Sequence, residues 1–346
     1  MPRKRVTQAD VALRAGVSQT AVSQILSGRE NGVSNFRPET CQRVLQAAEE
    51  LGYVPSMMAR ALRTNRTMTI GVVVGFITDE LSIRITRGIL DVANERGYGI
   101  LIGTSEQDPQ LEARVVEQLH GYQVDGLIFV DSWADPDTLL DNPSYPPMIF
   151  AQLRKLMVAR NCVGTDDVAG GYEATRHLLD LGYRKVAYIS GPEHWASAAE
   201  RLKGYRQALA DYGLPYDPSL VEWGDWEICS GIETTNSLLD RHPDIDAIFV
   251  ANDLMAAGTI QVAATRGLRI PHDLALVGYD DRQFAQALCP PLTSFAHPLH
   301  MIGQKAAQLL INRLLQHNAR HVPSISVSGR LVIRESCGAA LRPARP

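Results

Sequence analysis

The stretch VTQADVALRAGVSQTAVSQIL, residues 6–26, contains two short helical patterns that are joined by a tight turn at Gly16. Thr7 and Asp10 have the spacing of a capping box, which predicts that a first helix starts there. Gly16 ends that helix, and Ser18 is suited to cap a second one. Two short helices around a brief glycine-containing turn are typical of a helix-turn-helix, so the stretch predicts a DNA-binding motif.

A third helix is predicted for PETCQRVLQAAEEL, residues 38–51, because proline suits the first position of a helix. Apolar residues recur at helical spacing in all three segments, which predicts a small helical core. The residues expected inside are Val11, Ala12, Ala15, Val22, Ile25, Leu26, Val44, Leu45, Ala48 and Leu51. The predicted DNA-binding domain is therefore all-α and covers residues 1–54.

The second helix is predicted to read base edges in the major groove. Its first exposed side chains are expected to be Gln19 and Thr20, followed one turn later by Ser23 and Gln24. Glutamine offers adenine both a donor and an acceptor, and threonine adds a hydrogen bond or a methyl contact. The alternative is that these residues are only the polar surface of a small bundle. The predicted set of DNA contacts in this domain and its hinge is completed by Thr7, Ser18, Arg37, Ser56, Arg60 and Leu62.

Basic charge is concentrated in the same part of the chain. Residues 1–66 hold ten Lys and Arg against five Asp and Glu, a net charge of +5, which leaves −9 for the remainder of a chain whose net charge is −4. A small basic unit on an acidic body favours a polyanion as the partner of the small unit alone. A solvated basic face is the alternative.

The segment GYVPSMMARALRTNRT, residues 52–67, predicts a hinge helix and linker over residues 55–68. A helix of under two turns is not stable alone in water. Its arginines, Arg60 among them, suit phosphates, and Leu62 has no evident core to enter. A segment that folds on meeting DNA and inserts Leu62 as an apolar wedge into the minor groove accounts for this composition. An ordinary basic linker is the alternative.

From residue 69 to residue 346, apolar strand patterns alternate with amphipathic helices, which predicts parallel sheets with helices on both faces. Strands are expected at 69–74, 98–103, 124–131, 184–191, 245–253 and 274–280. VDGLIFVD and IDAIFVAND occupy the same place in two successive series, so two similar lobes are predicted. The N-lobe is expected to span about 69–158 and part of 281–325, and the C-lobe about 163–280 and 325–338. Crossovers are expected near 150–165 and 280–297.

Ligands of open α/β sheets bind beyond the carboxyl ends of the strands, so residues that follow strands are candidate effector contacts. These positions hold Phe76, Asn252 and Asp280, and the same loops carry Trp195 and Trp226. Carboxylates, amides and flat aromatic faces suit a polyhydroxylated ligand such as a sugar, with a nucleobase as the alternative. For Asp253 and Asp281 the structural alternative is that they cap the helices that follow them. For Trp195 the structural alternative is packing at a lobe edge.

The head and hinge quoted above resemble those of the lactose/galactose-repressor (LacI/GalR) family, and the resemblance extends over nearly the whole chain. Its landmarks in the body are DDVAGGYEATRHLLDLGYRKVAYISGP, ERLKGY, VANDLMAAG, VGYDD and PPLTSF. The resemblance implies a helix-turn-helix head and hinge helix on a two-lobed α/β core like that of periplasmic binding proteins. By position it implies base reading by Gln19, Thr20 and Gln24, a wedge at Leu62, and effector contacts by Arg201, Trp226, Asn252, Asp280, Gln152 and Phe76.

Two stretches depart from the family pattern. GRENGVSNFR, residues 28–37, is longer than the usual loop between the second and third helices, and its role is open. GFITDELSIRI, residues 75–85, replaces a loop that usually contains proline. The identity of the effector therefore does not follow from the resemblance.

Together these features predict a sequence-specific DNA-binding transcriptional regulator that acts as a repressor. It is expected to be a homodimer on near-palindromic operator DNA, because two-fold protein symmetry requires two half-sites. Its operator affinity is expected to depend on a small-molecule effector, a saccharide, bound between the lobes, with no cofactor and no metal. An effector-dependent activator and a repressor that needs a purine-type corepressor are the alternatives.

Other classes of protein are disfavoured. No apolar run reaches the roughly 18 residues that a membrane span needs. The charged start is followed by a capping pattern rather than an apolar signal region, which predicts the cytoplasm and argues against a transport receptor. A GxxxxGKS/T loop, HExxH, GxSxG and a strand-linked GxGxxG are all missing, which argues against an enzyme.

The five scattered cysteines are predicted to be buried, reduced thiols. The tail SCGAALRPARP lacks an apolar heptad repeat, which disfavours a coiled-coil tetramer, and the choice between dimer and tetramer stays open.

Overall fold

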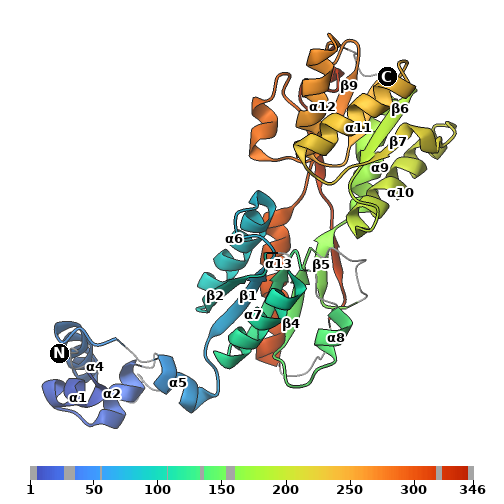
Figure 1. Cartoon of the computed structure of the whole chain (residues 1–346). Helices are drawn as coiled ribbons and strands as arrows, with labels where there is room; N and C mark the ends of the chain where they lie inside the picture. The colour runs from blue at the N-terminus through green and yellow to red at the C-terminus, as the bar shows by residue number, and fades with distance from the viewer. Residues whose placement is uncertain are drawn as a thin grey trace. The chain divides into compact units, whose positions relative to one another are not determined.

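Two structural units divide the chain between Thr67 and Met68. The computed structural model describes residues 6–26, 36–54, 57–106, 108–132, 136–152, 160–316 and 322–341. The N-terminal unit is helical, and the larger unit is an α/β structure (Figure 1).

The described helices of the N-terminal unit are α1 (Gln8–Ala15), α2 (Gln19–Leu26), α4 (Pro38–Glu50) and α5 (Met57–Thr64). The capping box at the start of α1 is confirmed, because the Thr7 hydroxyl accepts from the Asp10 amide and the Thr7 amide donates to the Asp10 carboxylate at 2.8 Å. Gly16 ends α1 with a φ of 66°, a left-handed conformation that glycine adopts without steric cost. The turn between α1 and α2 therefore depends on Gly16.

A core of small and branched side chains holds α1, α2 and α4 together. Its buried members are Val11, Ala12, Ala15, Val22, Ile25, Cys41, Val44, Ala47 and Ala48, with Leu26 and Leu51 packed at its edge. The predicted interior position of Leu45 is wrong, because that side chain is 56% exposed while Ala47 and Ala48 occupy the buried face of α4. An ion pair of 2.7 Å between Arg14 and Glu50 also joins α1 to the end of α4.

The larger unit contains two six-stranded sheets of described strands, one in the N-lobe and one in the C-lobe. The N-lobe order is β11-β5-β4-β3-β1-β2 and the C-lobe order is β12-β10-β9-β8-β6-β7. The N-lobe strands are β1 (Thr69–Val74), β2 (Gly99–Thr104), β3 (Gly126–Val130), β4 (Met148–Ala151), β5 (Cys162–Thr165) and β11 (Ile325–Val327). The C-lobe strands are β6 (Val186–Ser190), β7 (Val221–Trp223), β8 (Ala247–Val250), β9 (Ala275–Asp280), β10 (Thr293–Ala296) and β12 (Arg330–Val332).

Helices cover both faces of each sheet, which explains why central strands such as β3 and β8 are continuous apolar runs. The N-lobe helices are α6 (Glu80–Glu95), α7 (Pro109–Gly121), α8 (Pro136–Leu140) and α13 (Leu299–Gln316). The C-lobe helices are α9 (Asp167–Asp180), α10 (Ala196–Asp211), α11 (Ile228–Arg241) and α12 (Asp253–Thr265), with short 3-10 turns at Pro218–Leu220, Gln283–Ala287 and Ala339–Leu341. In each lobe neighbouring strands are parallel, except that β12 runs antiparallel to β10.

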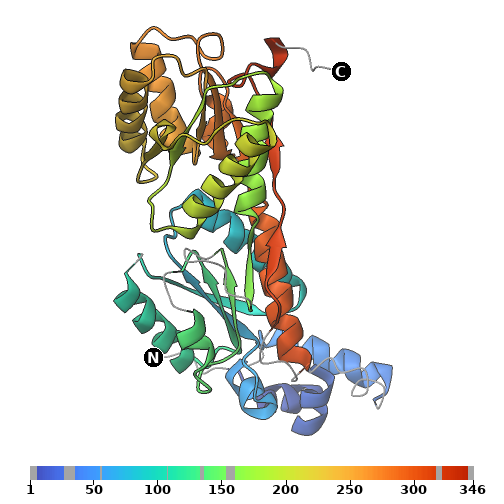
Figure 2. The same cartoon turned by 90° about the vertical axis from the view of Figure 1, so that its right-hand side faces the viewer.

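The described chain passes between the lobes after β5, after β10 and after β11 (Figures 1 and 2). The expected start of the C-lobe at about 163 is wrong, because β5 belongs to the N-lobe sheet through Thr165. The expected end of this C-lobe segment at about 280 is also wrong, since β10 lies in the C-lobe sheet, whereas α13, within the expected 281–325, belongs to the N-lobe as predicted. In each of these three passages the chain leaves its lobe from the carboxyl end of a strand. The carboxyl ends of the two sheets therefore face each other.

Cys41, Cys162 and Cys337 are buried and free, as predicted, but the prediction is wrong for Cys229 and Cys289, which are exposed. Among the described residues no helix is both long enough and apolar enough to span a bilayer.

Candidate DNA-reading helix and effector site

The exposed face of α2 carries three of the four residues that are predicted to read bases. Gln19, Thr20 and Gln24 are exposed, and Ser23 is half-buried. The α2 helix follows the turn at Gly16 and presents its first turn on the surface. This is the geometry in which the N-terminal end of a recognition helix can enter a major groove.

Two of the other predicted DNA contacts have a structural role. The Ser18 hydroxyl accepts from the Ala21 amide at 3.2 Å and caps α2, and Thr7 caps α1. Their substitution is expected to act partly through helix stability, since such caps contribute about 1 kcal/mol each. Arg37, in contrast, is exposed at the start of α4, and its side chain makes no capping bond there.

The hinge helix α5 presents Leu62 with 89% of its surface exposed. An apolar side chain in that position stays available to a partner, as the wedge prediction requires. Ser56 lies outside the described residues, as do the side chain of Arg60 and residues 27–35 of the long loop.

A buried charged cluster lies at the carboxyl ends of the C-lobe strands, centred on Arg201 of α10. Its Nε donates to the Asp167 carboxylate at 2.8 Å, and its Nη1 donates to the carbonyl of Ala251. The guanidinium carbon lies 3.7 Å from the ring centre of Tyr279, whose hydroxyl donates to the same Asp167 at 2.9 Å. The ion pair is 4–5% exposed, so Arg201 is held rigidly.

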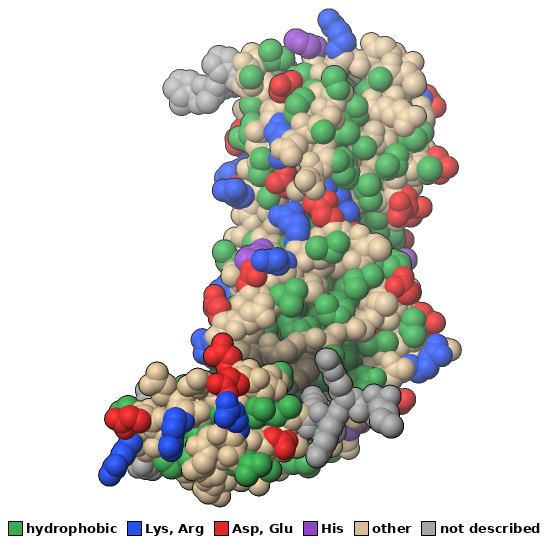
Figure 3. All heavy atoms as spheres, turned by 90° about the vertical axis from the view of Figure 1, so that its left-hand side faces the viewer, with side chains coloured by type: hydrophobic (Ala, Val, Ile, Leu, Met, Phe, Trp, Pro, Cys, Tyr) green, Lys and Arg blue, Asp and Glu red, His purple; other side chains and the backbone are tan. Residues whose placement is uncertain are grey.

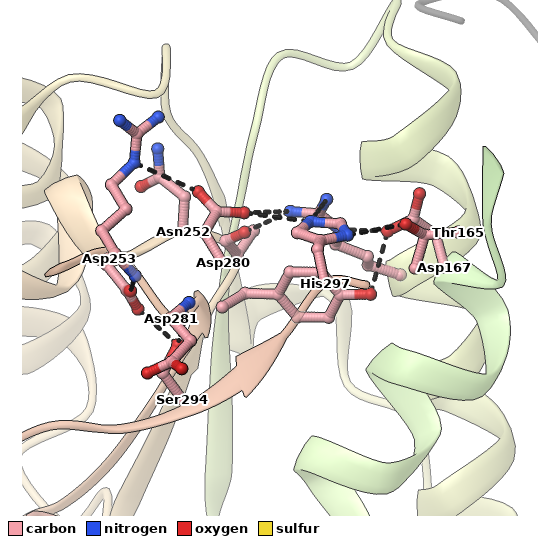
Figure 4. Close-up of polar contacts among 12 residues, drawn as sticks. Thr165, Asp167, Asn252, Asp253, Asp280, Asp281, Ser294 and His297 are labelled. Carbon is pink, nitrogen blue, oxygen red and sulfur yellow. Dashed lines mark hydrogen bonds and ion pairs between the residues drawn. The ribbon is translucent and has the colours of Figure 1, made fainter. Parts of the chain in front are cut away.

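His297 joins this cluster to the N-lobe. Its Nε2 lies 3.1 Å from Asp280 Oδ1 and 3.2 Å from Arg201 Nη2, and its Nδ1 lies 2.8 Å from the hydroxyl of Thr165 (Figure 4). Thr165 ends β5, and His297 follows β10, so both sit at chain crossovers. In Figure 4 His297 lies between Asp280 and Thr165, with Asp167 on the Thr165 side. Hydrogen bonds therefore connect the candidate effector residues to the crossovers between the lobes.

Two tryptophans form the apolar side of this cluster. The rings of Trp195 and Trp226 are 5.5 Å apart at 60°, and the Arg201 guanidinium carbon lies 5.5 Å from the Trp226 ring. Asn252 donates its side-chain amide to the Trp226 carbonyl at 2.8 Å and caps α12 by accepting from the Met255 amide. Asn252, rather than Asp253, thus caps α12. Asn252 also positions Trp226.

The indole of Trp226 is packed against bare backbone at Gly191. A methyl group added at Gly191 would lie 2.1 Å from two atoms of the indole. Trp226 has a φ of 76°, which is rare for a bulky side chain, and such strain is concentrated at functional sites. The ring is therefore held by its surroundings, not by local backbone preference.

We expect Gly191→Ala to displace the Trp226 ring and to lower the free energy of unfolding by about 1–3 kcal/mol, as overpacking does. Near-UV circular dichroism should report the loss of the Trp195–Trp226 contact, and chemical denaturation should report the stability. The matched control is Gly121→Ala, because a methyl group there meets no atom within 4 Å. A Gly191→Ala spectrum identical to that of the wild type would contradict this packing argument.

The N-lobe contributes the remaining candidates. Gln152 follows β4 with a φ of 59°, and its side-chain oxygen accepts from the Thr165 amide at 3.1 Å, so it contacts the crossover that His297 also contacts. Phe76 is half-buried at the carboxyl end of β1. The structure brings Arg201, Asp280, Trp195, Trp226 and Asn252 into one set of contacts, with Gln152 linked through Thr165, while Phe76 stands outside these hydrogen bonds.

Charges in the cluster shift the ionisation of its members. Burial raises the pKa of Asp280, but the hydrogen bond from His297 and the charges of His297, Arg282 and Arg201 outweigh it, so the pKa lies below its ordinary value. Burial, followed by the charges of Asp167 and Asp166, raises the pKa of Glu200 to about 7. Asp280 is therefore an anionic hydrogen-bond acceptor at neutral pH.

The sequence rule missed Asp167, Tyr279 and His297. Asp167 lies two residues after β5 and His297 directly follows β10, so the rule of polar residues after strands would have selected them had those strands been recognised. Both strands are only four residues long and carry no extended apolar run. Tyr279 lies inside a predicted strand, where an aromatic residue is ordinary core.

A cavity of about 360 Å³ lies elsewhere, at the amino end of β4. Its lining includes Asp141, Pro146 and Arg313 and none of the residues of the charged cluster. The rule that ligands bind at the carboxyl ends of strands favours the cluster as the effector site. Within the described residues no three His, Cys, Asp or Glu side chains gather as a metal site requires.

Comparison with known proteins is consistent with both halves of this architecture. The family of bacterial regulatory proteins, lacI family, matches residues 7–56, and a periplasmic binding protein-like domain matches residues 175–337. The HTH-type transcriptional regulator CelR of Thermobifida fusca is 36% identical over 344 residues, covering 96% of this chain and 99% of that protein.

Two solved structures are also similar. A complex of transcriptional regulator CelR with cellobiose has a TM-score of 0.71 and 33% identity, covering 96% of this chain and 100% of that one. A lac repressor dimer bound to operator and the anti-inducer ONPF has a TM-score of 0.83 and 27% identity, covering 96% and 99%. With a helix-turn-helix head, a two-lobed core and a relative of this identity along its length, the chain belongs to the lacI family of bacterial regulatory proteins and is a DNA-binding transcriptional regulator.

Proposed function

We propose that this protein is a homodimeric repressor that leaves its operator when a saccharide binds between the lobes. The observation that carries the proposal is the arrangement of Arg201, Asp280 and Trp226 at facing strand ends, joined by His297 to the crossovers. A buried anionic acceptor, a guanidinium and an aromatic face match the hydroxyl groups and the apolar ring face of a sugar.

The DNA half of the proposal is supported by α2 and α5. Exposed Gln19, Thr20 and Gln24 supply the donors and acceptors that read bases, and Arg37 suits a phosphate. The exposed Leu62 suits the minor groove, where an apolar wedge unstacks a base step and bends the duplex. Specific binding then needs both the bases and the bend.

The dimer is supported by apolar side chains that are exposed along the β2 edge of the N-lobe and near it. Edge strand β2 exposes Leu101 and Ile102 by 38% and 44%, and Ile77 and Ile83 near the start of α6 are each 51% exposed. Figure 3 shows hydrophobic side chains gathered on this face of the body. An edge strand with exposed apolar residues needs a partner to avoid uncontrolled association, and a second copy satisfies two-fold operator symmetry.

The saccharide is supported by the similar CelR protein, whose structure is a cellobiose complex. We therefore expect cellobiose, or a related β-linked oligosaccharide, to act as the effector here. A nucleobase is the less favoured ligand, because the cluster offers charged groups to hydroxyls more readily than a flat slot to a purine.

The test begins with operator selection from a random duplex library by the full-length protein. Cellobiose is then titrated while operator affinity is followed by fluorescence anisotropy. We expect a loss of affinity of about 5–150-fold, the usual range of allosteric coupling. Trp226→Ala should abolish the response and keep the operator affinity.

The outcomes separate the alternatives. A rise in operator affinity on adding a sugar would make the ligand a corepressor. A response to hypoxanthine alone would favour the hypothesis of a purine effector. If the protein prefers no duplex sequence over random competitor DNA, the proposal of an operator-specific repressor fails.

A further inference from the structure

Two loops join the lobes by polar contacts outside the effector cluster. The N-lobe loop leads into α6 and carries Asp79 and Glu80, and the C-lobe loop follows β9 and carries Arg282 and Gln283. Arg282 Nη1 donates to Asp79 Oδ1 at 3.1 Å, and the Gln283 amide donates to Glu80 Oε1 at 3.0 Å. We call these four residues the interlobe latch.

Arg282 also faces the candidate effector carboxylate. Its Nε lies 3.5 Å from Asp280 Oδ2, and the two side chains are 13% and 4% exposed. Among the described residues, no acceptor forms a hydrogen bond with this buried Nε. The Arg282 guanidinium thus lies between Asp280 of the C-lobe and Asp79 of the N-lobe. Its buried Nε can still form a hydrogen bond if the loop rearranges.

The backbone that holds Arg282 is strained. Asp280 and Asp281 have φ angles of 102° and 50°, and the first lies outside the small left-handed well that non-glycine residues tolerate. Two such residues in sequence mean that the loop is held in place by its contacts, and strain of this kind is concentrated at switches and clamps. The contacts available to hold it include Asp253, which accepts from the Arg282 amide at 2.7 Å.

We propose that Arg282 is a positioning residue through which occupancy of Asp280 controls the contact between the lobes. The identity of Asp280 as an effector contact rests on the proposed function, and the latch contact itself rests on the geometry alone. In the free protein the Asp280 charge holds the guanidinium so that its Nη1 reaches Asp79. A ligand hydroxyl that donates a hydrogen bond to Asp280 weakens the attraction between the Asp280 carboxylate and the Arg282 guanidinium.

Thermodynamic reciprocity makes this a two-way link. If a ligand at Asp280 weakens the latch, breaking the latch must change the affinity for that ligand by the same factor. Since Arg282 and Asp79 are partly buried, their pair is screened less than an ordinary surface ion pair.

The C-lobe offers a matched control. Arg334 pairs with Asp281 at 2.7 Å, and these side chains are 18% and 20% exposed, close to the 13% and 24% of Arg282 and Asp79. Arg334 follows β12, so this pair stays within the C-lobe. Removing it tests the loss of an arginine beside the same loop without cutting a contact between lobes.

The first experiment needs no ligand. Hydrogen–deuterium exchange of the full-length protein is compared for the wild type, Arg282→Met, Asp79→Asn and Arg334→Met, at residues 80–86 and 281–288. Asparagine still caps α6, so Asp79→Asn tests the latch with the helix start preserved. Arg282→Met and Asp79→Asn are expected to speed exchange in both segments by about threefold or more, and the double variant should add little.

Arg334→Met should leave the N-lobe segment at its wild-type rate. If Arg282→Met exchanges at the wild-type rate in both segments, or if Arg334→Met accelerates the N-lobe segment equally, the latch proposal is overturned.

The second experiment adds cellobiose to the anisotropy assay. Arg282→Met is expected to bind cellobiose but to show a smaller ratio of operator affinities without and with the sugar. An unchanged ratio would refute the coupling through Arg282. If the wild type does not respond to cellobiose, the saccharide assignment fails, while the exchange experiment still decides the latch.

Discussion

Arg201→Ala is expected to lower the free energy of unfolding by about 3–5 kcal/mol, because it leaves Asp167 as a buried charge without its partner. It should also abolish the response to effector, since Arg201 contacts both His297 and the Trp226 ring. Chemical denaturation measures the first effect, and operator release in the anisotropy assay measures the second. A variant that folds at low temperature should still bind operator through its intact head.

Two further variants make the Arg201 result specific. Arg206→Ala removes an exposed arginine from the same helix, one that donates to the Tyr216 hydroxyl at 2.8 Å, and should change stability by about 0.5 kcal/mol or less. Arg201→Lys keeps the charge but loses the planar guanidinium that donates to both Asp167 and the Ala251 carbonyl, so it should restore part of the stability and little of the response. Wild-type stability and response in Arg201→Ala would remove this residue from the site.

Deletion of residues 1–67 is expected to abolish specific operator binding, a loss of about 1,000-fold or more. The deletion ends at the boundary between the two units, and the remaining body keeps its own cores in both lobes. Cellobiose affinity measured by calorimetry should therefore stay within about twofold of the full-length value, since sites with no shared partners are additive.

Full-length Gln19→Ala is the companion to this deletion. It should cost about 1–3 kcal/mol on the selected operator and relax the preference at one base position, because Gln19 is exposed and its loss leaves the head folded. If the isolated body loses cellobiose binding, the two units are not separate modules and the division at Thr67 is functionally wrong.

The head could be predicted from its sequence almost residue by residue. Caps and turns are local, so Thr7, Asp10 and Gly16 specify α1 and its end without help from the rest of the chain. Leu45 shows the limit of local reasoning. Helical spacing allows either Leu45 or Ala47 to face inward, and only close packing of α1 and α2 against α4 selects the alanine.

The lobes could be predicted only where strands are long. The runs that became β1, β3 and β8 are apolar enough to be recognised, whereas β5, β10 and β11 have three or four residues and lie at lobe edges or crossovers. Asp167 and His297 follow two of these short strands, so they were missed together with them. Asp280 could be predicted because it ends β9, whose preceding residues form an apolar run.

The link between Arg282 and Asp79 could not be predicted at all. The two residues are 203 positions apart, and neither lies in a motif that signals an ion pair. Contacts of this kind follow from the way the lobes face each other, which the pattern of apolar residues does not encode.

The repeated passage of the chain between the lobes has a consequence for biosynthesis. α13 and β11 complete the N-lobe, and Ser336 accepts from the Leu276 amide inside the C-lobe, yet all of them leave the ribosome after most of both lobes. Neither lobe can close its hydrophobic surface until these segments have emerged, so nascent chains should depend on chaperones up to that point. A truncation before α13 would then leave both lobes incomplete at once, because α13 and β11 belong to the N-lobe and β12 belongs to the C-lobe.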